Sequence, residues 1–185
     1  MEREHHAEWQ ELRARATDEL RRGAATSLRR GQPHRLVQVL VLPSFAPSLA
    51  YEVFCVPSVS APTASVPEAF VAIRTCWDQP ADLACFATPV ERLRHARVLQ
   101  PTMVRRQGTL AAAEARALVA DLANLQLPLA PGPASFGLDG TRNELMLDAG
   151  SAEATGRWWE RPPANWAAAA ALAERVVAWV EAVVR

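Results

Sequence analysis

The stretch that decides the fold is residues 136–166, FGLDGTRNELMLDAGSAEATGRWWERPPANW. Apolar residues alternate over 142–148, which predicts a strand, and 155–159 predicts the partner strand of a β-hairpin. Two consecutive prolines at 162–163 end the second strand, because proline cannot donate a backbone hydrogen bond to a sheet. An amphipathic run over 166–184 then predicts a final helix, so this segment joins a sheet to a helix.

The chain upstream of this segment also alternates between strand and helix patterns. Runs rich in leucine and β-branched residues, bounded by proline and serine, indicate strands, and a long alanine-rich run indicates a helix. Strands are expected at 35–42, 49–56 and 69–77, an edge or irregular strand at 98–105, a helix at 109–125, and a short helix within 80–97 that opens at Thr88 and Pro89. The expected fold class is α+β: a mainly antiparallel sheet of about five to six strands packed against two or three helices, with an extra N-terminal helix.

The chain is expected to divide into an N-terminal helical extension, 1–31, and a single α+β domain, 32–185. Within the extension, 2–22 predicts a helix with a narrow apolar stripe on an otherwise charged surface. Two interpretations remain open: a surface helix docked by that stripe, or an oligomer contact or flexible arm. The stripe consists of Trp9, Leu12, Ala16 and Leu20.

The composition is that of a neutral globular protein. Twenty acidic residues balance twenty basic ones, and the sequence contains no lysine, so every basic residue is arginine. This bias suggests a GC-rich bacterial genome, and the number of arginines is therefore no argument for phosphate binding. Zero net charge argues against strong attraction to nucleic acid or to anionic membranes, and neither is an expected partner.

The three cysteines, Cys55, Cys76 and Cys85, are odd in number and lack metal-ligand spacing. Cys55 and Cys76 lie in or at the end of apolar runs, so both are expected to be small buried hydrophobic residues. The charged N-terminus lacks the apolar core of a signal peptide, and no apolar run reaches the ~20 residues of a spanning helix. A cytoplasmic location with reduced thiols is expected.

No group of residues predicts a catalytic, cofactor-binding or metal site. The Asp139-Gly140-Thr141 turn is similar to part of the Asp-x-Asp-Gly-Thr loop of haloacid-dehalogenase-like phosphotransferases, but Gly137 occupies the position of the nucleophilic carboxylate. The histidines show no metal-binding spacing. We therefore expect no enzyme activity and no cofactor.

The tryptophans are the remaining signal. On a strand, Trp158 and Trp159 must face opposite sides of the sheet, and Trp166 is placed to pack over one of them. One interpretation is a structural cluster that fixes the final helix to the sheet. The other is an exposed tryptophan among charged residues that forms a hot spot for a protein partner. The candidate partner-binding residues are Arg157, Trp158, Trp159, Glu160 and Arg161.

The order GLDGTRNEL, then RWW, then PPANW before an amphipathic helix resembles a C-terminal signature of small uncharacterised bacterial proteins, many of them immunity-protein-like. The candidate structural motif of this signature is Gly137, Asp139, Gly140, Thr141 and Trp166. The resemblance implies a non-enzymatic protein that binds, neutralises or escorts the product of a neighbouring gene. The near-neutral charge departs from the acidic surface that would suit a basic nuclease toxin.

Two functional hypotheses follow from the sequence. The first is a protein-binding protein, which predicts an exposed patch of aromatic, arginine and glutamate side chains without a deep polar pocket. The second is a small enzyme or ligand-binding domain, with a pocket around Asp139, Thr141, Arg142 and Trp158.

Overall fold

The computed structural model describes residues 2–24, 33–56, 69–85, 100–127, 139–148 and 153–184 of the 185-residue chain. The strands are β1 His34–Pro43, β2 Leu49–Val56, β3 Ala69–Trp77, β4 Met103–Thr109, β5 Thr141–Asp148 and β6 Glu153–Trp159. The helices are α1 Glu2–Arg22, α2 Gln79–Cys85, α4 Ala112–Asn124 and α5 Ala167–Val183, and a short 3-10 helix, η2 Ala164–Trp166, directly precedes α5.

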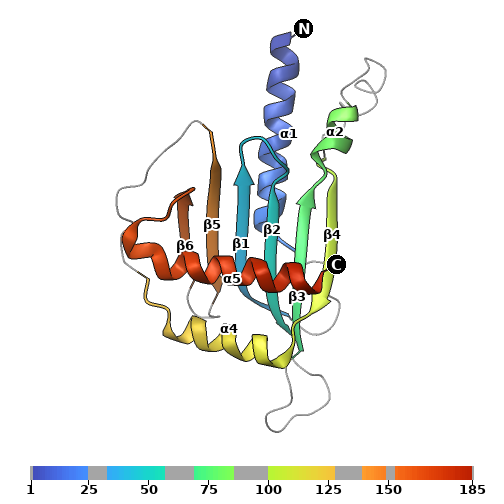
Figure 1. Ribbon diagram of the computed structural model, residues 1–185. Coiled ribbons are helices and arrows are strands. Elements are labelled where there is room, and N and C mark those ends of the chain that lie inside the picture. The colour runs from blue at the N-terminus through green and yellow to red at the C-terminus, as the bar shows by residue number, and fades with distance from the viewer. Residues whose placement is uncertain are drawn as a thin grey trace.

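The strands form one antiparallel sheet in the order β4-β3-β2-β1-β5-β6 (Figure 1). Strands β1 to β4 form a meander, and β5 then pairs with the free side of β1 and is followed by its partner β6. Helices α4 and α5 pack on one face, and α1 packs on the opposite face. The expected α+β fold, with its antiparallel sheet and N-terminal helix, is confirmed.

The boundaries of β4 and α4 differ from the sequence prediction. The strand expected at 98–105 begins at Met103, because Pro101 has no backbone N–H and the N–H of Thr102 binds the Asp82 carboxylate at 3.0 Å. The strand continues to Thr109, which pairs with β3. Helix α4 therefore begins at Ala112 rather than at 109.

A buried carboxylate fixes α2 and the approach to β4. Asp82 accepts hydrogen bonds from the Trp77 indole at 2.6 Å and from the Thr102 hydroxyl at 2.6 Å. Asp78 caps the helix by accepting the Ala81 N–H at 3.2 Å. Helix α2 overlaps the start of the short helix expected within 80–97, and the predicted opening at Thr88 and Pro89 lies outside the described residues.

The main core lies between the sheet and helices α4 and α5. Helix α5 crosses the strands and contacts β1 to β5 (Figure 1). Its buried side chains include Leu172, Val176 and Val180. Its last turns are also tied to the sheet by Glu181, which accepts hydrogen bonds from the Tyr51 hydroxyl and from Arg74, each at 2.8 Å. Burial and the bond to Glu181 raise the pKa of Tyr51, so this hydroxyl stays a donor.

Two glycines allow α5 to reach both edges of the sheet. Gly156 on β6 lies under the Trp166 ring, which a Cβ at this position would overlap. Gly108 on β4 lies under the backbone of Val183, which a Cβ would also overlap. The absence of a side chain at these two positions brings the start and the end of the helix onto the two edge strands.

Helix α1 docks on the other face by the stripe predicted from the sequence. Leu12, Ala16 and Leu20 are buried, and Trp9 stacks on Trp77 with ring centroids 5.4 Å apart. The opposing sheet residues include Leu40 of β1. Residues of the expected 1–31 extension thus form the helical layer on the second face of the sheet.

Candidate functional site

The β5–β6 pair carries the tryptophans that the sequence singled out. Trp158 pairs with Asn143 and faces α5, where only 6% of its surface is exposed. Trp159 pairs with Arg142, faces α1 and is half-buried. Trp158 therefore belongs to the core beneath α5, whereas Trp159 lies half-buried at the surface of the opposite face.

The remaining candidate partner-binding residues lie beside Trp159. Arg157, Glu160 and Arg161 are exposed. Glu160 has a positive φ of 39°, a conformation that is uncommon outside glycine. Its carboxylate lies over Gly140, where a Cβ would overlap it.

The Asp-Gly-Thr segment works as a turn. Gly140 has a φ of +139°, and its carbonyl accepts the Ser44 N–H at 2.9 Å and the Ser44 hydroxyl at 3.0 Å. The Thr141 carbonyl accepts the Glu160 N–H at 2.7 Å. Asp139 is exposed, and Gly137 lies outside the described residues. Of the members of this structural motif that the structure describes, Trp166 packs in the core.

The pocket proposed around Asp139, Thr141, Arg142 and Trp158 would need side chains from both faces of the sheet. Trp158 lines a hollow of about 290 Å³ beneath α5, together with Asn143. Arg142 lines a different hollow on the α1 face. The sheet itself separates these two residues.

The hollow on the α1 face, here called the Trp159 pocket, combines groups from four elements. It has a volume of about 210 Å³. Helix α1 contributes Arg13 and Thr17, and the β1–β2 region contributes Leu42, Ser44 and Ser48. Arg142 and Trp159, from β5 and β6, complete the lining. Two guanidinium groups, three hydroxyls and one indole thus surround a small volume.

Next to this pocket, three arginines surround one buried carboxylate. Glu144 is 1% exposed, and its two oxygens accept hydrogen bonds from Arg21 at 2.8 and 3.0 Å. Arg142 approaches it at 3.2 Å and Arg157 at 3.5 Å. Burial acts to raise the pKa of Glu144, but the bond and charge of Arg21, with Arg157 and Arg142, lower it overall. We call these four residues the arginine cluster.

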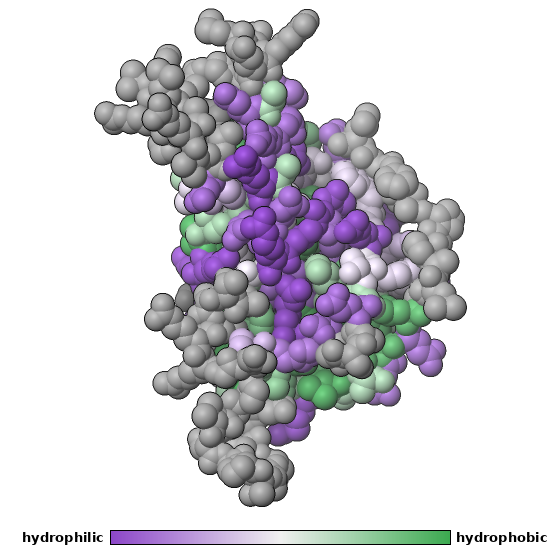
Figure 2. Space-filling model, turned by 180° about the vertical axis from the view of Figure 1, so that it is seen from behind, coloured by the Kyte–Doolittle hydropathy of each residue, from purple (hydrophilic) through white to green (hydrophobic). Residues whose placement is uncertain are grey.

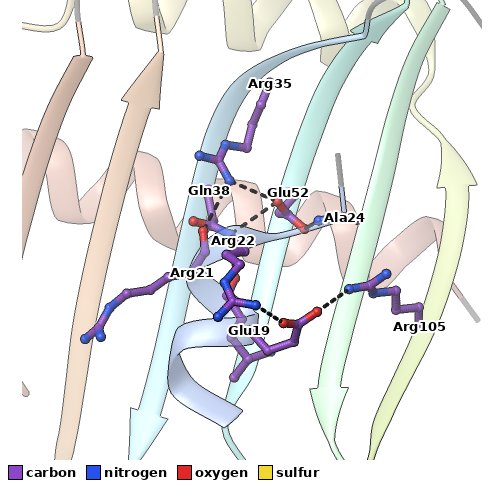
Figure 3. A network of polar contacts seen from close by, with 9 residues as sticks. Glu19, Arg21, Arg22, Ala24, Arg35, Gln38, Glu52 and Arg105 are labelled. Atoms are coloured by element: carbon purple, nitrogen blue, oxygen red, sulfur yellow. Dashed lines mark hydrogen bonds and ion pairs between the residues drawn. The ribbon is translucent and has the colours of Figure 1, made fainter. Parts of the chain in front are cut away.

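A polar network holds the end of α1 on the sheet (Figure 3). Gln38 donates to the Leu20 carbonyl at 2.8 Å, and the Ala24 N–H donates to Glu52 at 3.0 Å. Burial raises the pKa of Glu52, although the Ala24 bond and the charge of Arg35 act in the opposite direction. The network fixes the position of α1 and thereby of the arginines along its flank.

The Trp159 pocket and the arginine cluster share Arg142 and form one arginine–tryptophan surface: Arg13, Arg21, Arg142, Arg157 and Trp159. Figure 2 views the molecule from the α1 side, where hydrophilic side chains gather in a broad band. The acidic members of this area are Asp18, which pairs with Arg21 at 3.2 Å, Glu144, and Glu160, whose carboxylate lies near the Trp159 indole over Gly140. Four arginines against three carboxylates leave a small local excess of positive charge.

Sequence reasoning missed Arg13, Arg21 and Glu144. Positions 13, 17 and 21 recur every four residues, which places them on one helix face beside the apolar stripe. Glu144 lies within the alternating run 142–148, and a carboxylate in a predicted strand was the signal that could have found it. What the sequence does not encode locally is that α1 packs over β2 and β3 and turns one flank toward β5 and β6.

The other predicted features concern cysteine chemistry and membranes. Cys55 and Cys76 are half-buried rather than buried, because both lie near strand ends, and none of the three cysteines forms a disulfide. In the described ranges, no group of three or more His, Cys, Asp or Glu side chains is arranged to hold a metal ion. None of the helices described is both long and apolar enough to cross a membrane. Comparison of the chain with protein-family models, with curated proteins and with solved structures finds no match.

Proposed function

We propose that this chain is a non-enzymatic protein-binding protein whose arginine–tryptophan surface holds an acidic surface of a protein partner. The observation that carries the proposal is the arginine cluster. Three guanidinium groups converge on the buried Glu144, and their side chains remain 30%, 44% and 62% exposed for Arg21, Arg142 and Arg157. Their free donors are available to a second molecule.

Preorganisation is the reason this arrangement favours binding. An arginine that is already held by a buried carboxylate loses less side-chain entropy on association than a free one. Arginine and tryptophan also dominate the energetic centres of protein interfaces. The excess of positive charge is local, since the whole chain is neutral, so it selects a region of the partner rather than polyanions in general.

The finer proposal is an immunity-like role in a bacterial cytoplasm, in which the partner is the product of a neighbouring gene. The C-terminal signature of the sequence supports this role. The enzyme or ligand-binding alternative is weaker, because its four residues are divided between two faces of the sheet. A basic binding surface suits an acidic partner.

The proposal is tested by co-expressing the chain with the product of each adjacent gene and measuring complex formation by size exclusion and calorimetry. We expect one product to bind, with an affinity that falls as salt is raised. The Arg157→Glu variant should weaken binding by about tenfold or more, because it places a like charge against the acidic partner.

Arg116→Glu is the matched control, since Arg116 is exposed on α4, away from this surface. It should bind like the wild type. The proposal fails if no adjacent gene product binds, or if the two charge reversals weaken binding equally.

A further inference from the structure

We infer that the Trp159 pocket receives a single carboxylate from an aspartate or glutamate side chain of the partner. This inference rests on the proposed function, and it names the chemical group that the surface recognises. The Trp159 pocket is the concave part of the arginine–tryptophan surface, and it shares Arg142 with the arginine cluster.

Size limits the occupant to about one side chain. The pocket volume of about 210 Å³ lies below the ~300–1,000 Å³ typical of sites for whole small molecules. The indole of Trp159 and the side chain of Leu42 supply an apolar wall. That wall suits the methylene groups of an acidic side chain and lowers the local dielectric around its charge.

Charge defines the group at the end of that side chain. Among the described residues, the half-buried Arg13 guanidinium has no hydrogen-bond or ion-pair partner. Arg142 uses its Nε atom toward Glu144 at 3.2 Å, and its terminal nitrogens bind no acceptor in the described part of the chain. Both guanidinium groups therefore offer free donors to an anion.

The hydroxyl groups add one further donor. Thr17 donates to the Arg13 carbonyl at 3.0 Å and Ser44 to the Gly140 carbonyl at 3.0 Å, so their protons are already used. The hydroxyl of the buried Ser48 makes no hydrogen bond to any described residue. Two guanidiniums and one hydroxyl proton match the acceptor capacity of a carboxylate.

A carboxylate fits this charge better than a phosphate does. Arg142 shares the single negative charge of Glu144 with Arg21 and Arg157, and the Glu160 carboxylate lies near the Trp159 indole, so the unbalanced charge of the pocket is smaller than that of the two guanidinium groups. A phosphate group carries about −1.5 to −2 at neutral pH, which would leave part of its charge without a partner. A carboxylate carries a single charge.

The test uses the full-length protein and N-acetyl-glutamate α-amide as the probe. Binding is followed by NMR through the Trp159 indole N–H, assigned with Trp159→Phe, and through the backbone N–H groups of Ser44 and Ser48. At constant ionic strength we expect saturable shifts with a dissociation constant in about the millimolar range. The neutral isostere N-acetyl-glutamine α-amide should cause none, and inorganic phosphate should bind more weakly.

Two variants locate the charge. Arg13→Gln and Arg142→Gln should each raise the dissociation constant about tenfold or more, because each removes a charge-assisted bond. Arg13 lies half-buried on the flank of α1, so Arg13→Gln should leave the fold intact. Arg116→Gln is the control that should leave binding unchanged.

The inference is overturned if the neutral isostere shifts the same resonances equally, if phosphate binds more tightly, or if the glutamate probe causes no shift. A protein partner that still binds in co-expression would then show that the proposed function survives without this pocket. Conversely, if the probe binds but no adjacent gene product does, the carboxylate pocket is supported and the proposed function is contradicted.

Discussion

Glu144 lies on β5 with its carboxylate buried, and arginines from α1, β5 and β6 surround it. A carboxylate without these partners would be costly to bury. With them, burial is offset, and the carboxylate holds three surface arginines in place. Glu144 therefore connects the stability of the fold to the geometry of the arginine–tryptophan surface.

We expect the stability contribution of Glu144 to depend on pH. Folding lowers its pKa below the ordinary value of 4.5, so its contribution is complete above that value and is lost as the pH falls through the lower, folded-state pKa. At neutral pH, Glu144→Gln should lower the free energy of unfolding by about 2 kcal/mol, typical for a hydrogen-bonded charged group. Urea unfolding at several pH values should show this difference shrinking in acid.

Glu153→Gln is the control for this measurement, because Glu153 is an exposed carboxylate at the start of β6. It should change the free energy of unfolding by less than about 0.5 kcal/mol at any pH. A difference for Glu144→Gln that stays constant with pH would contradict the assigned pKa shift.

At the residue level, the sequence predicted which face of the sheet a side chain occupies better than it predicted whether that side chain is buried. The opposite facing of Trp158 and Trp159 follows from the two-residue period of a strand, and the structure has it. Which of them stays accessible depends on what covers each face. The local sequence could not predict that α5 buries Trp158 while α1 leaves a pocket beside Trp159.

Helix α1 is the element that completes the arginine–tryptophan surface. The helix covers Leu40, Trp77 and the buried Gln38 on the sheet, and Ala24 just after it packs on Phe54 and binds Glu52. Without the helix, this face would expose apolar groups and leave buried hydrogen-bonding groups without partners. The helix is therefore expected to be part of the folded unit.

A chain that begins at residue 32 tests this expectation. We expect it to lose cooperative thermal unfolding or to unfold at a much lower temperature than the full chain, as measured by circular dichroism. A milder variant, Leu20→Ala, should lower the free energy of unfolding by about 2–4 kcal/mol, whereas Asp18→Ala should have little effect. A truncated chain with an unchanged transition would instead support 32–185 as an independent domain.

At the level of elements, hydrophobic periodicity predicted most of the sheet. The strands at 49–56 and 69–77 have the expected bounds, and the final helix begins within one residue of its expected start. The main shift is in β4, where hydrogen bonds to Asp82 and pairing with β3 set the ends of the strand. Such tertiary contacts carry no signal within the strand itself.

At the scale of the whole molecule, α5 joins the two edges of the sheet. The chain leaves β6, turns through η2 and crosses back until the end of α5 reaches β4. Strand order alone leaves β6 and β4 far apart, because four strands lie between them. The glycines at 156 and 108 make both contacts close, so a change at either edge should affect the stability of the whole fold.

We therefore expect Gly156→Ala to lower the free energy of global unfolding by about 1–3 kcal/mol, because its methyl group overlaps the Trp166 ring. Trp166→Leu removes most of that ring, so Gly156→Ala should cost less in its presence, which a double-mutant cycle measures by chemical denaturation. Gly108→Ala should destabilise as well, but its methyl group meets the Val183 backbone, so Trp166→Leu should not relieve it. Thr155→Ala, on the opposite face of β6, is the control. Equal costs of Gly156→Ala with and without the Trp166 ring would show that α5 is not seated on β6 by this contact.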